Sequence, residues 1–428
     1  MLDRVAAIDV HKKMLAVVVA DVAGEGEYPF ERRKFGTTPE QLELLTRWRI
    51  QQEVEEAVME STAEYWRPVW GTLEQHGKPE RQKREGATQM SGALPLCQAK
   101  SNRGRRGRKS DFIDAERRVK RLVAQELVLS FVPDPEPRLW RTVTRRKYQL
   151  TRDKVRFQNQ LESLLEPAYI KLSSWVSDLL GLSARRMLQA LADGESDPAA
   201  LAALADHRLR ATPAQLRDAL GACAHLHPVY RRLLKMALEE LKLLEDQIAK
   251  LDGEAAELLQ EHQETIQRLA EVPGLGASSA VQIVAEVGPK AEAFESAKEM
   301  SSWVGVCPGS NETAGEAHST TSPKGNRNMR RLLNQAAQAA VKVKGSIFEI
   351  AFRKFLSRKM PYKEAIWAIA HRLCRLIWLL LRRKVRYEER GPAVSAKSQC
   401  TRTTRMIKEL RKLGYRVDGG PLPAAIPA

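Results

Sequence analysis

The sequence predicts an α/β domain, then a helical region with a coiled coil, then a mainly helical C-terminal domain. Strand-like apolar runs alternate with helical segments over roughly the first 130 residues. A heptad repeat occupies residues 228–270, and helical patterns continue from 271 to about 386. The domains expected are 1–135, 136–270 and 271–390, the last opening like a helix-hairpin-helix, followed by a basic, partly disordered tail at 391–428 with a short helix near 403–413.

The elements of the first domain are predicted from two kinds of pattern. Apolar runs that end at turn residues indicate strands, whereas Thr38 before Pro39 is typical of a helix start. The elements expected are two strands within 4–22 joined by a turn at 11–13, a third strand near 28–35, a helix over 38–51, a strand over 54–59 and a helix over 63–76.

The central region is predicted to contain two long helices. Residues 139–165 carry an apolar stripe, and residues 228–270 carry a heptad repeat that His262 and Thr265 interrupt. Residues 193–213 are expected to form a connector. The heptad has two open interpretations, namely helices packed within one chain or a dimer interface. Its residues are Leu234, Leu241, Ile248 and Ala255 at one position and Leu244, Leu251 and Leu258 at the other.

The chain is strongly basic. Its 70 Lys and Arg residues against 53 Asp and Glu give a formal net charge of +17, which favours nucleic acid as a partner. A basic protein without a nucleic-acid role is the alternative. Residues 100–109 form a Gly-containing cationic segment suited to phosphate contacts, or else a solvated loop with no partner. Its candidate contacts are Arg103, Arg105, Arg106, Arg108 and Lys109.

The cysteines and the apolar runs indicate a cytoplasmic protein without membrane association. Five scattered cysteines form no Cys-x-x-Cys pair, which argues against a disulfide framework and fits a reducing compartment. The N-terminus lacks an apolar signal core, and the apolar stretch at 376–381 is far shorter than the ~20 residues of a membrane span. The eight histidines show no metal-ligand spacing such as His-x-x-x-His.

Four carboxylates form the first candidate site. Asp9 lies in an apolar strand, where an ionised side chain is costly unless it is paired or bound to a metal. Glu60 ends another strand, and Asp111 and Asp114 share one face of a predicted helix. Converging, the four acids are suited to two divalent cations such as Mg²⁺. Each acid also has a simpler interpretation when it is considered alone: Asp111 as the N-cap of a helix, and Asp114 as an acid on the surface of that helix.

Two further segments have the composition of phosphate-binding loops. Gly274 and Gly276 lie in VPGLG between helical stretches, where amide groups can face a phosphate; a plain turn is the alternative. Residues 303–331 combine glycine and hydroxyl side chains with the basic Lys324, Arg327 and Arg330, as phosphoryl transfer requires. A flexible DNA-contacting loop is the alternative there.

Taken in order, these segments resemble the insertion-sequence transposases that have an N-terminal DEDD RuvC-like domain and a C-terminal serine-bearing domain, the bridge-RNA-guided recombinases. The segments that carry the resemblance are AIDVHKK around Asp9, VMEST around Glu60, GRKSDFIDA around Asp111 and Asp114, VPGLGASSAVQIVAEVG, WVGVCPGSNETAGE and SPKGNRNMRRLLNQAA. Each motif is weak alone, but the ordered set is specific and spans nearly the whole chain.

The resemblance implies an RNase H-like first domain with Asp9, Glu60, Asp111 and Asp114 as a catalytic, Mg²⁺-binding tetrad. It implies DNA and a noncoding bridge RNA as partners, with sequence choice made largely by base pairing. It also implies a homo-oligomer, a dimer or tetramer, in which the two kinds of domain form one composite site. The expected reaction is DNA strand cleavage and rejoining through a covalent hydroxyl–phosphate intermediate.

One position departs from the family pattern. The family has a serine in a P-G-x-N-E-S-A-G run, whereas this sequence has Thr313, and Glu316 stands where the family often has a basic residue. A threonine hydroxyl can attack phosphorus, although its methyl group restricts χ1. Three accounts remain, in order of preference: a working Thr313 nucleophile, a decayed copy, or Ser310 recruited by a shifted loop.

Two other functions fit parts of the sequence. A RuvC-like structure-specific endonuclease would hydrolyse branched DNA with the tetrad alone and would form no covalent adduct. A nucleic-acid-binding regulator or decayed transposase would bind without depending on a divalent metal. The intact tetrad argues against full decay, because a decayed copy has no physical need for Asp9 in an apolar strand.

Overall fold

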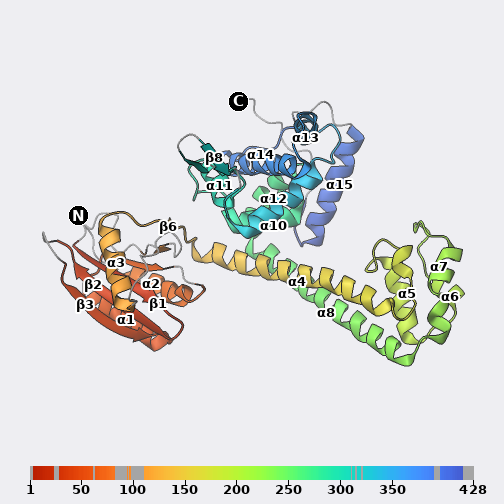
Figure 1. The fold of residues 1–428 in the computed structure, drawn as a ribbon, viewed down its shortest axis with the longest axis horizontal. Coiled ribbons are helices and arrows are strands. Elements are labelled where there is room, and N and C mark those ends of the chain that lie inside the picture. Colours follow the sequence, from red (N-terminus) through yellow and green to blue (C-terminus); the bar gives the residue numbers. More distant parts are fainter. Residues whose placement is uncertain are drawn as a thin grey trace. The chain divides into compact units, whose positions relative to one another are not determined.

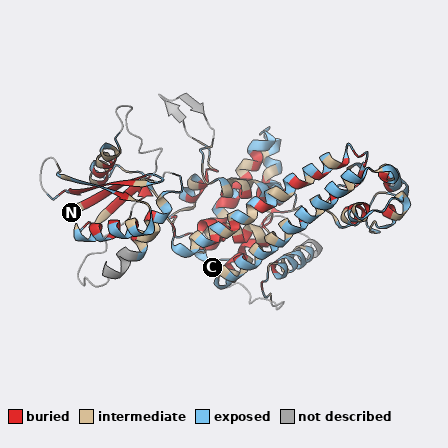
Figure 2. Cartoon of the chain, turned by 90° about the horizontal axis from the view of Figure 1, so that it is seen from below, coloured by how far each residue is buried: buried red, intermediate tan, exposed pale blue. Residues whose placement is uncertain are grey.

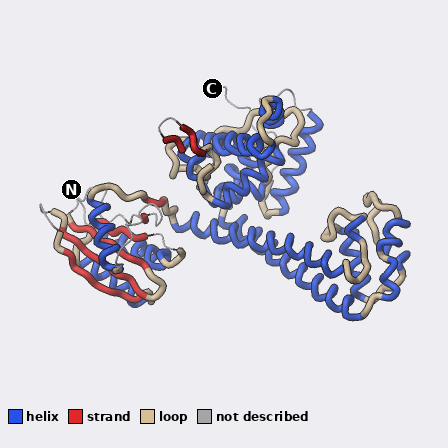
Figure 3. The backbone as a smooth tube through the Cα atoms, viewed as in Figure 1, coloured by secondary structure: helices blue, strands red, loops and turns tan. Residues whose placement is uncertain are grey.

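The computed structural model describes residues 3–23, 28–60, 63–81, 94, 96–97, 110–309, 311–313, 316–319, 322–389 and 396–417. The chain divides into two compact units, Met1–Pro133 and Asp134–Ala428 (Figure 1). Across the described residues, strands belong to the first unit and to one short hairpin of the second, and the rest of the second unit is mainly helical (Figure 3). An α/β first unit and a helical remainder match the predicted fold class.

A mixed sheet forms the centre of the first unit. Its described strands are β1 (Arg4–Val10), β2 (Met14–Asp21), β3 (Phe30–Gly36), β4 (Glu56–Glu60), β5 (Leu96–Cys97) and β6 (Leu129–Ser130). Their order across the sheet is β3-β2-β1-β4-β5-β6. β1 pairs antiparallel with β2 and parallel with β4. The predicted turn at 11–13 joins β1 to β2, and Glu60 is the last residue of β4.

Helices cover both faces of this sheet. α1 (Pro39–Gln51) and α2 (Trp66–Arg81) pack on the face that holds Ile8 of β1. α3 (Asp111–Val123) packs on the other face, against Ala7 of β1 and Val58 of β4. Side chains alternate along a strand, so Asp9 and Glu60, each two residues further on, belong to the α3 face. Figure 2 shows the buried strands beneath the helices of this unit.

α3 is held on the sheet by an apolar stripe. Ala115, Val119 and Leu122 follow the spacing of one helix face and are buried against the sheet. Full burial of a Val or Leu side chain contributes roughly 1.5–3 kcal/mol. This packing fixes the rotation of α3, and therefore the direction in which its polar residues at 111, 114 and 118 point.

The second unit is built around two long helices, α4 (Pro135–Leu165) and α8 (Pro228–Leu258), which lie side by side and run in opposite directions (Figure 1). Its other described elements are α5 (Leu182–Asp193), α6 (Pro198–Ala203), α7 (Pro213–Ala219), α9 (Gln263–Ala270), α10 (Ala277–Val287), α11 (Ala297–Val304), β7 (Asn311–Thr313), β8 (Glu316–Ser319), α12 (Arg327–Ala340), α13 (Ile347–Ser357), α14 (Tyr362–Arg383), α15 (Ala396–Lys412) and short 3-10 turns at Leu172–Ser174, Gly221–His225 and Gln260–His262.

Two apolar cores lie at opposite ends of this helix pair. Leu161 of α4 and Leu234 and Leu241 of α8 are buried with α5–α7 in one core. Trp140, near the start of α4, is buried in the other core with α9–α14. α4 therefore contributes residues to both cores. The heptad residues Leu234 and Leu241 pack within one chain.

One predicted boundary in this unit is wrong. The heptad helix was expected to run to 270, but α8 ends at Leu258 and a 3-10 turn at Gln260–His262 precedes α9, next to the predicted interruption at His262. The expected connector 193–213 joins α5 to α7 and contains the short helix α6, whose N-cap Asp197 accepts hydrogen bonds from two backbone N–H groups. None of the described helices is long and apolar enough to cross a membrane.

Candidate functional site

Asp9 is a buried carboxylate near the end of β1. It lies opposite Ala16 of β2 and on the face of the sheet that α3 covers. Val5 and Ala7, which precede it on the same face, are buried in the apolar core between the sheet and α3. The carboxylate therefore emerges where the apolar packing ends, and it requires a partner at this position.

α3 brings a row of polar residues to this edge. Asp111, Asp114 and Arg118 are spaced by three and four residues and so lie on one side of the helix. Asp111 is the first residue of α3, where a carboxylate interacts favourably with the helix dipole. The N-cap position is held by Ser110, so the alternative of Asp111 as an N-cap is wrong.

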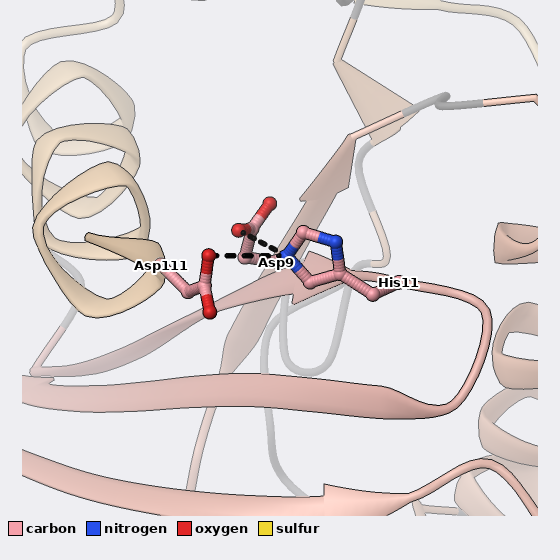
Figure 4. A group of neighbouring side chains, drawn as sticks. All are labelled: Asp9, His11 and Asp111. Carbon is pink, nitrogen blue, oxygen red and sulfur yellow. Dashed lines mark hydrogen bonds and ion pairs between the residues drawn. The ribbon is translucent and has the colours of Figure 1, made fainter. Parts of the chain in front are cut away.

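Asp9, His11 and Asp111 form a compact cluster (Figure 4). His11 Nε2 lies 3.1 Å from Asp9 Oδ2 and 3.3 Å from Asp111 Oδ1. Asp9 is buried, His11 is exposed and Asp111 is half-buried, so the cluster opens to solvent on one side. Asp9 lies in β1 and His11 directly follows that strand, two residues further on, so that both side chains meet Asp111 of α3.

Arg118 lies beneath this cluster and binds two of the acids. Its Nη1 donates to Asp9 Oδ1 at 3.0 Å, and its Nη2 donates to Glu60 Oε2. Burial alone would lower the pKa of the Arg118 guanidinium, but the charges of Asp9 and Glu60 outweigh it and raise this pKa. Asp114 pairs instead with Arg117 at 2.8 Å. Of the four predicted acids, Asp9 and Asp111 thus come together with His11, whereas Glu60 shares Arg118 with Asp9 and Asp114 pairs with Arg117.

The donor set at this edge suits a divalent cation. Ligand atoms of Asp9, His11 and Asp111 all lie within 4.8 Å of one another. Carboxylate oxygen is the ligand that Mg²⁺ and Mn²⁺ prefer, and an imidazole nitrogen is accepted more readily by transition metals. The residues present therefore fit a divalent metal, and metal binding by Asp9 and Asp111 stays a prediction. The predicted cationic segment, Arg103, Arg105, Arg106, Arg108 and Lys109, lies outside the described residues.

A short hairpin in the second unit carries Thr313. Its strands β7 and β8 pair antiparallel, with Thr313 opposite Glu316 at the turn end. The other candidate Ser310 lies outside the described residues. After the hairpin, Lys324, which precedes α12, and Arg327, its first residue, are both exposed, as phosphate contacts need to be.

The two ends of the hairpin segment are held together by close backbone packing. Gly305 has a φ of +75°, and a Cβ there would lie 2.5 Å from the Pro323 carbonyl oxygen. A Cβ on Gly325 would lie 2.2 Å from the carbonyl oxygen of Val304. The backbone N–H of Asn326 donates to the carbonyl of Trp303 at 3.1 Å. The segment that carries Thr313 is therefore a loop with a closed base.

Side chains of α12 and α14 reinforce this base. Arg330 Nη1 donates to the carbonyl oxygens of Gly305 and Pro323, the latter at 2.7 Å. Its guanidinium lies 4.7 Å from the centre of the Trp367 ring. Trp367 Nε1 donates to Ser322 Oγ at 2.8 Å. Arg330, predicted to contact nucleic acid, thus makes contacts inside the chain that fix the hairpin's ends.

Glu286 of α10 anchors the same region to α4. Its carboxylate is 3% exposed and accepts two hydrogen bonds from Arg145, at 2.8 and 2.9 Å. Asn326 and Asn328 also donate to it, each at 3.0 Å. Burial would raise the Glu286 pKa, but the bonds and charge of Arg145, together with Asn326, outweigh it and lower this pKa. The buried acid therefore fixes the start of α12, which follows the hairpin.

The glycines of VPGLG have packing roles in this structure. Gly274 has a φ of +84°, and a Cβ there would lie 2.2 Å from the Ala336 carbonyl oxygen of α12. Gly276 is the N-cap of α10, and a Cβ there would lie 2.9 Å from Glu409 Oε2 of α15. The contact with the α12 backbone, together with the positive φ, accounts for Gly274 without a phosphate, whereas Gly276 meets only the end of a flexible side chain.

Two family models match the segments that hold these sites. A DEDD transposase model of the IS110 type matches residues 6–170, and a model described as transposase IS116/IS110/IS902 family matches residues 266–351. The chain belongs to the IS110 family of transposases. The first match contains Asp9, Glu60, Asp111 and Asp114, and the second contains Thr313.

A curated relative agrees with this family. The IS110-family chain is 30% identical over 161 residues to a probable family 20 transposase of Pseudomonas aeruginosa. The match covers 36% of this chain and 46% of the relative. The chain therefore spans just under half the length of the curated relative that it matches.

Three residues of these sites were not predicted from the sequence of this family member. His11 was assigned to a turn, although the Asp-x-His spacing at a strand end was a signal that both side chains share a face. Arg118 continues the face of Asp111 and Asp114, but nothing in its spacing shows that it is buried. Glu286 is an acid within an otherwise apolar helix, and this pattern indicates a buried acid that needs a partner.

Proposed function

We propose that this chain is a transposase that cuts DNA strands and rejoins them through a covalent protein–DNA intermediate. The observation that carries the proposal is the presence, in one IS110-family chain, of a carboxylate cluster suited to a divalent cation and a separate hydroxyl-bearing hairpin with a closed base. The β3-β2-β1-β4-β5 order, with an acid on central β1, supports assignment of the first unit as an RNase H-like domain.

Thr313 is the proposed nucleophile. Its Oγ attacks the scissile phosphorus, a new P–Oγ ester forms, and the bond from phosphorus to one DNA oxygen breaks. That DNA oxygen leaves as a free hydroxyl, which takes up the proton that Thr313 loses. The number of phosphate ester bonds is unchanged, so a DNA hydroxyl can later reverse the attack and reseal a strand without an external energy source.

The acidic cluster is proposed to hold Mg²⁺ with Asp9, Glu60, Asp111 and Asp114. When bound, the ion supplies electrostatic stabilisation to the charged phosphate oxygens in the transition state. Lys324 and Arg327 are proposed to bind the DNA backbone, because both are exposed and lie directly after the hairpin. Arg330 and Glu286 are proposed to position this segment, because Arg330 Nη1 and the Glu286 carboxylate are used inside the chain; a phosphate contact by the rest of the Arg330 guanidinium stays a proposal.

The partners proposed are DNA and a noncoding bridge RNA. A formal net charge of +17 supports binding to both polyanions, with base pairing choosing the sequence. Arg103, Arg105, Arg106, Arg108 and Lys109 are proposed to contact phosphates. We also propose a homo-oligomer, in which the acidic cluster and the Thr313 hairpin act on the same phosphate.

A structure-specific endonuclease is the second candidate. It is favoured by the fact that the acidic cluster belongs wholly to the first unit, and by the threonine at the nucleophile position. Such an enzyme would use water as the nucleophile, so its products would carry free ends and no protein. The two candidates therefore differ in whether cleavage and strand joining depend on Thr313.

The test is a strand-joining assay with purified protein, Mg²⁺, the flanking noncoding RNA, labelled element-end DNA and target DNA. We expect joined strands with wild type and Thr313→Ser, and none with Thr313→Ala or Asp111→Asn. Thr151→Ala, an exposed threonine on α4, is the matched control and should behave as wild type. Metal-dependent cleavage that persists in Thr313→Ala would establish the endonuclease, and joining without RNA would contradict RNA guidance.

A further inference from the structure

Some carboxylate oxygens of the acidic cluster pair with arginine, and others face the open side. Arg118 takes one oxygen of Asp9 and one of Glu60, and Arg117 takes Asp114. The oxygen atoms that meet at the open side are Asp9 Oδ2 and Asp111 Oδ1, and the nitrogen between them is His11 Nε2 (Figure 4). The three atoms that are placed to share a ligand are therefore two oxygens and one nitrogen.

The spacing of these atoms matches neighbouring ligands of one ion. Neighbouring ligands of an octahedral ion with bonds of about 2.1 Å lie about 3.0 Å apart. The distances from His11 Nε2 to the two carboxylate oxygens are 3.1 and 3.3 Å. Small side-chain adjustments therefore suffice to centre a cation between them, and the exposed side of the cluster leaves room for water or phosphate oxygens.

The charges at this edge match one divalent cation better than two. In their ionised forms the four carboxylates carry twice the charge of the two paired guanidinium groups. The deficit that remains equals the charge of a single divalent ion. Arg118 is buried and continues the face of Asp111 and Asp114. Its guanidinium lies between Asp9 and Glu60 and supplies there the positive charge that a second metal ion would supply.

We propose that His11 is a direct ligand of a single divalent cation, bound between Asp9 and Asp111, with Arg118 in place of a second ion. The inference rests on the proposed function only in that the first unit binds a divalent cation. It narrows the set of four carboxylate ligands proposed above, because His11 takes the place of Glu60 and Asp114, which pair with Arg118 and Arg117. Because imidazole nitrogen favours transition metals over Mg²⁺, the site should prefer Mn²⁺.

The test uses Mn²⁺ and the full-length protein, stripped of metal and free of nucleic acid. Counting free Mn²⁺ by electron paramagnetic resonance should give one tightly bound ion per chain. Pulsed measurements on the bound ion should show coupling to a ¹⁴N nucleus, the signature of a directly bound imidazole. Two tightly bound ions, or a bound ion without nitrogen coupling, would overturn the inference.

Variants of His11 separate ligation from folding. His11→Ala should lose the nitrogen coupling and weaken Mn²⁺ binding about tenfold, whereas His11→Asp should retain a site but lower its preference for Mn²⁺ over Mg²⁺ by about tenfold. His207→Ala, whose side chain is 82% exposed in the second unit, is the matched control and should keep both signals. Unchanged coupling in His11→Ala would also contradict His11 ligation.

These readouts are independent of DNA chemistry. Nitrogen-coupled Mn²⁺ in a protein that never joins DNA strands would leave the inference standing and remove the proposed function. Strand joining that depends on Asp111 and Thr313, with no nitrogen coupling in wild type, would support the proposed function and contradict ligation by His11.

Discussion

Arg118 and Asp9 form an ion pair, 3.0 Å from Nη1 to Oδ1, between two side chains that are both buried. The pair joins α3 to β1, and Glu60 of β4 shares the same guanidinium. A buried ion pair of this kind adds little net stability compared with apolar packing, but removal of one partner leaves an uncompensated charge. The acidic edge of the sheet therefore depends on Arg118 for its structure, even before a metal binds.

Arg118→Met should lower the free energy of unfolding of the first unit by about 3–5 kcal/mol, because Asp9 and Glu60 lose their shared cation. Urea unfolding would measure the loss, and added Mn²⁺ should recover part of it. The double variant Asp9→Asn with Arg118→Met should also recover part, because one unpaired charge is removed. A loss below about 1 kcal/mol, the level of a surface ion pair, would contradict the structural role assigned to Arg118.

Glu286 should make the stability of the second unit depend on pH. Its pKa is lowered in the folded protein, so its contribution is complete above the unfolded value near 4.5 and is lost as pH falls below it. Glu286→Gln should cost about 1.5–3 kcal/mol at pH 7, because the charged hydrogen bonds from Arg145 are lost. Unfolding curves at pH 7 and pH 4 should show a smaller pH effect in this variant, and equal pH effects would contradict the account.

Trp367 is expected to act as a positioning residue for the Thr313 hairpin. Trp367→Phe keeps a ring for Arg330 but removes the N–H that binds Ser322, so strand joining should slow about tenfold while the Kd for DNA is unchanged. Ser322→Ala should cause the same loss, and the double variant should lose no more than either.

A second tryptophan on α14 supplies the control for this prediction. Trp378 donates to the Phe294 carbonyl rather than to Ser322, so Trp378→Phe should not slow joining selectively. Additive losses in the Trp367 and Ser322 variants would show that the two side chains act separately.

Gly274 should tolerate no side chain. Gly274→Ala places a Cβ against the Ala336 carbonyl at a positive φ, and should cost about 2–4 kcal/mol of unfolding free energy. Gly253→Ala is the matched control, because this glycine lies inside α8 with nothing within 4 Å of a built Cβ. It should stabilise the protein by up to about 1 kcal/mol. Equal effects of the two substitutions would contradict the close packing of α10 on α12.

The parts of this fold that could be predicted are those that local patterns decide. Asp9 was identified because an acid in an apolar strand is costly, and Asp111 and Asp114 because their spacing places them on one helix face. Arg118 follows the same spacing, but its burial depends on how α3 sits on the sheet. No local pattern distinguishes it from an exposed arginine.

The second unit shows the same division. The heptad predicted that Leu234 and Leu241 pack against another helix, but the sequence could not decide whether that helix belongs to the same chain. The structure places α4 there. The contacts of Arg330 with Gly305 and Pro323 join residues far apart in the local pattern, so the sequence alone could not predict them.

The most direct measurement is the identity of the residue that becomes attached to DNA. Protein, Mg²⁺, flanking RNA and element-end DNA would be incubated, denatured and digested with nuclease and protease, and the nucleotide-bearing peptide sequenced by mass spectrometry. We predict a nucleotide on Thr313. It should be absent in Thr313→Ala, and in Thr313→Ser it should be attached to the substituted residue at the same position. A nucleotide on Ser310, or DNA cleavage with no modified peptide, would contradict the account.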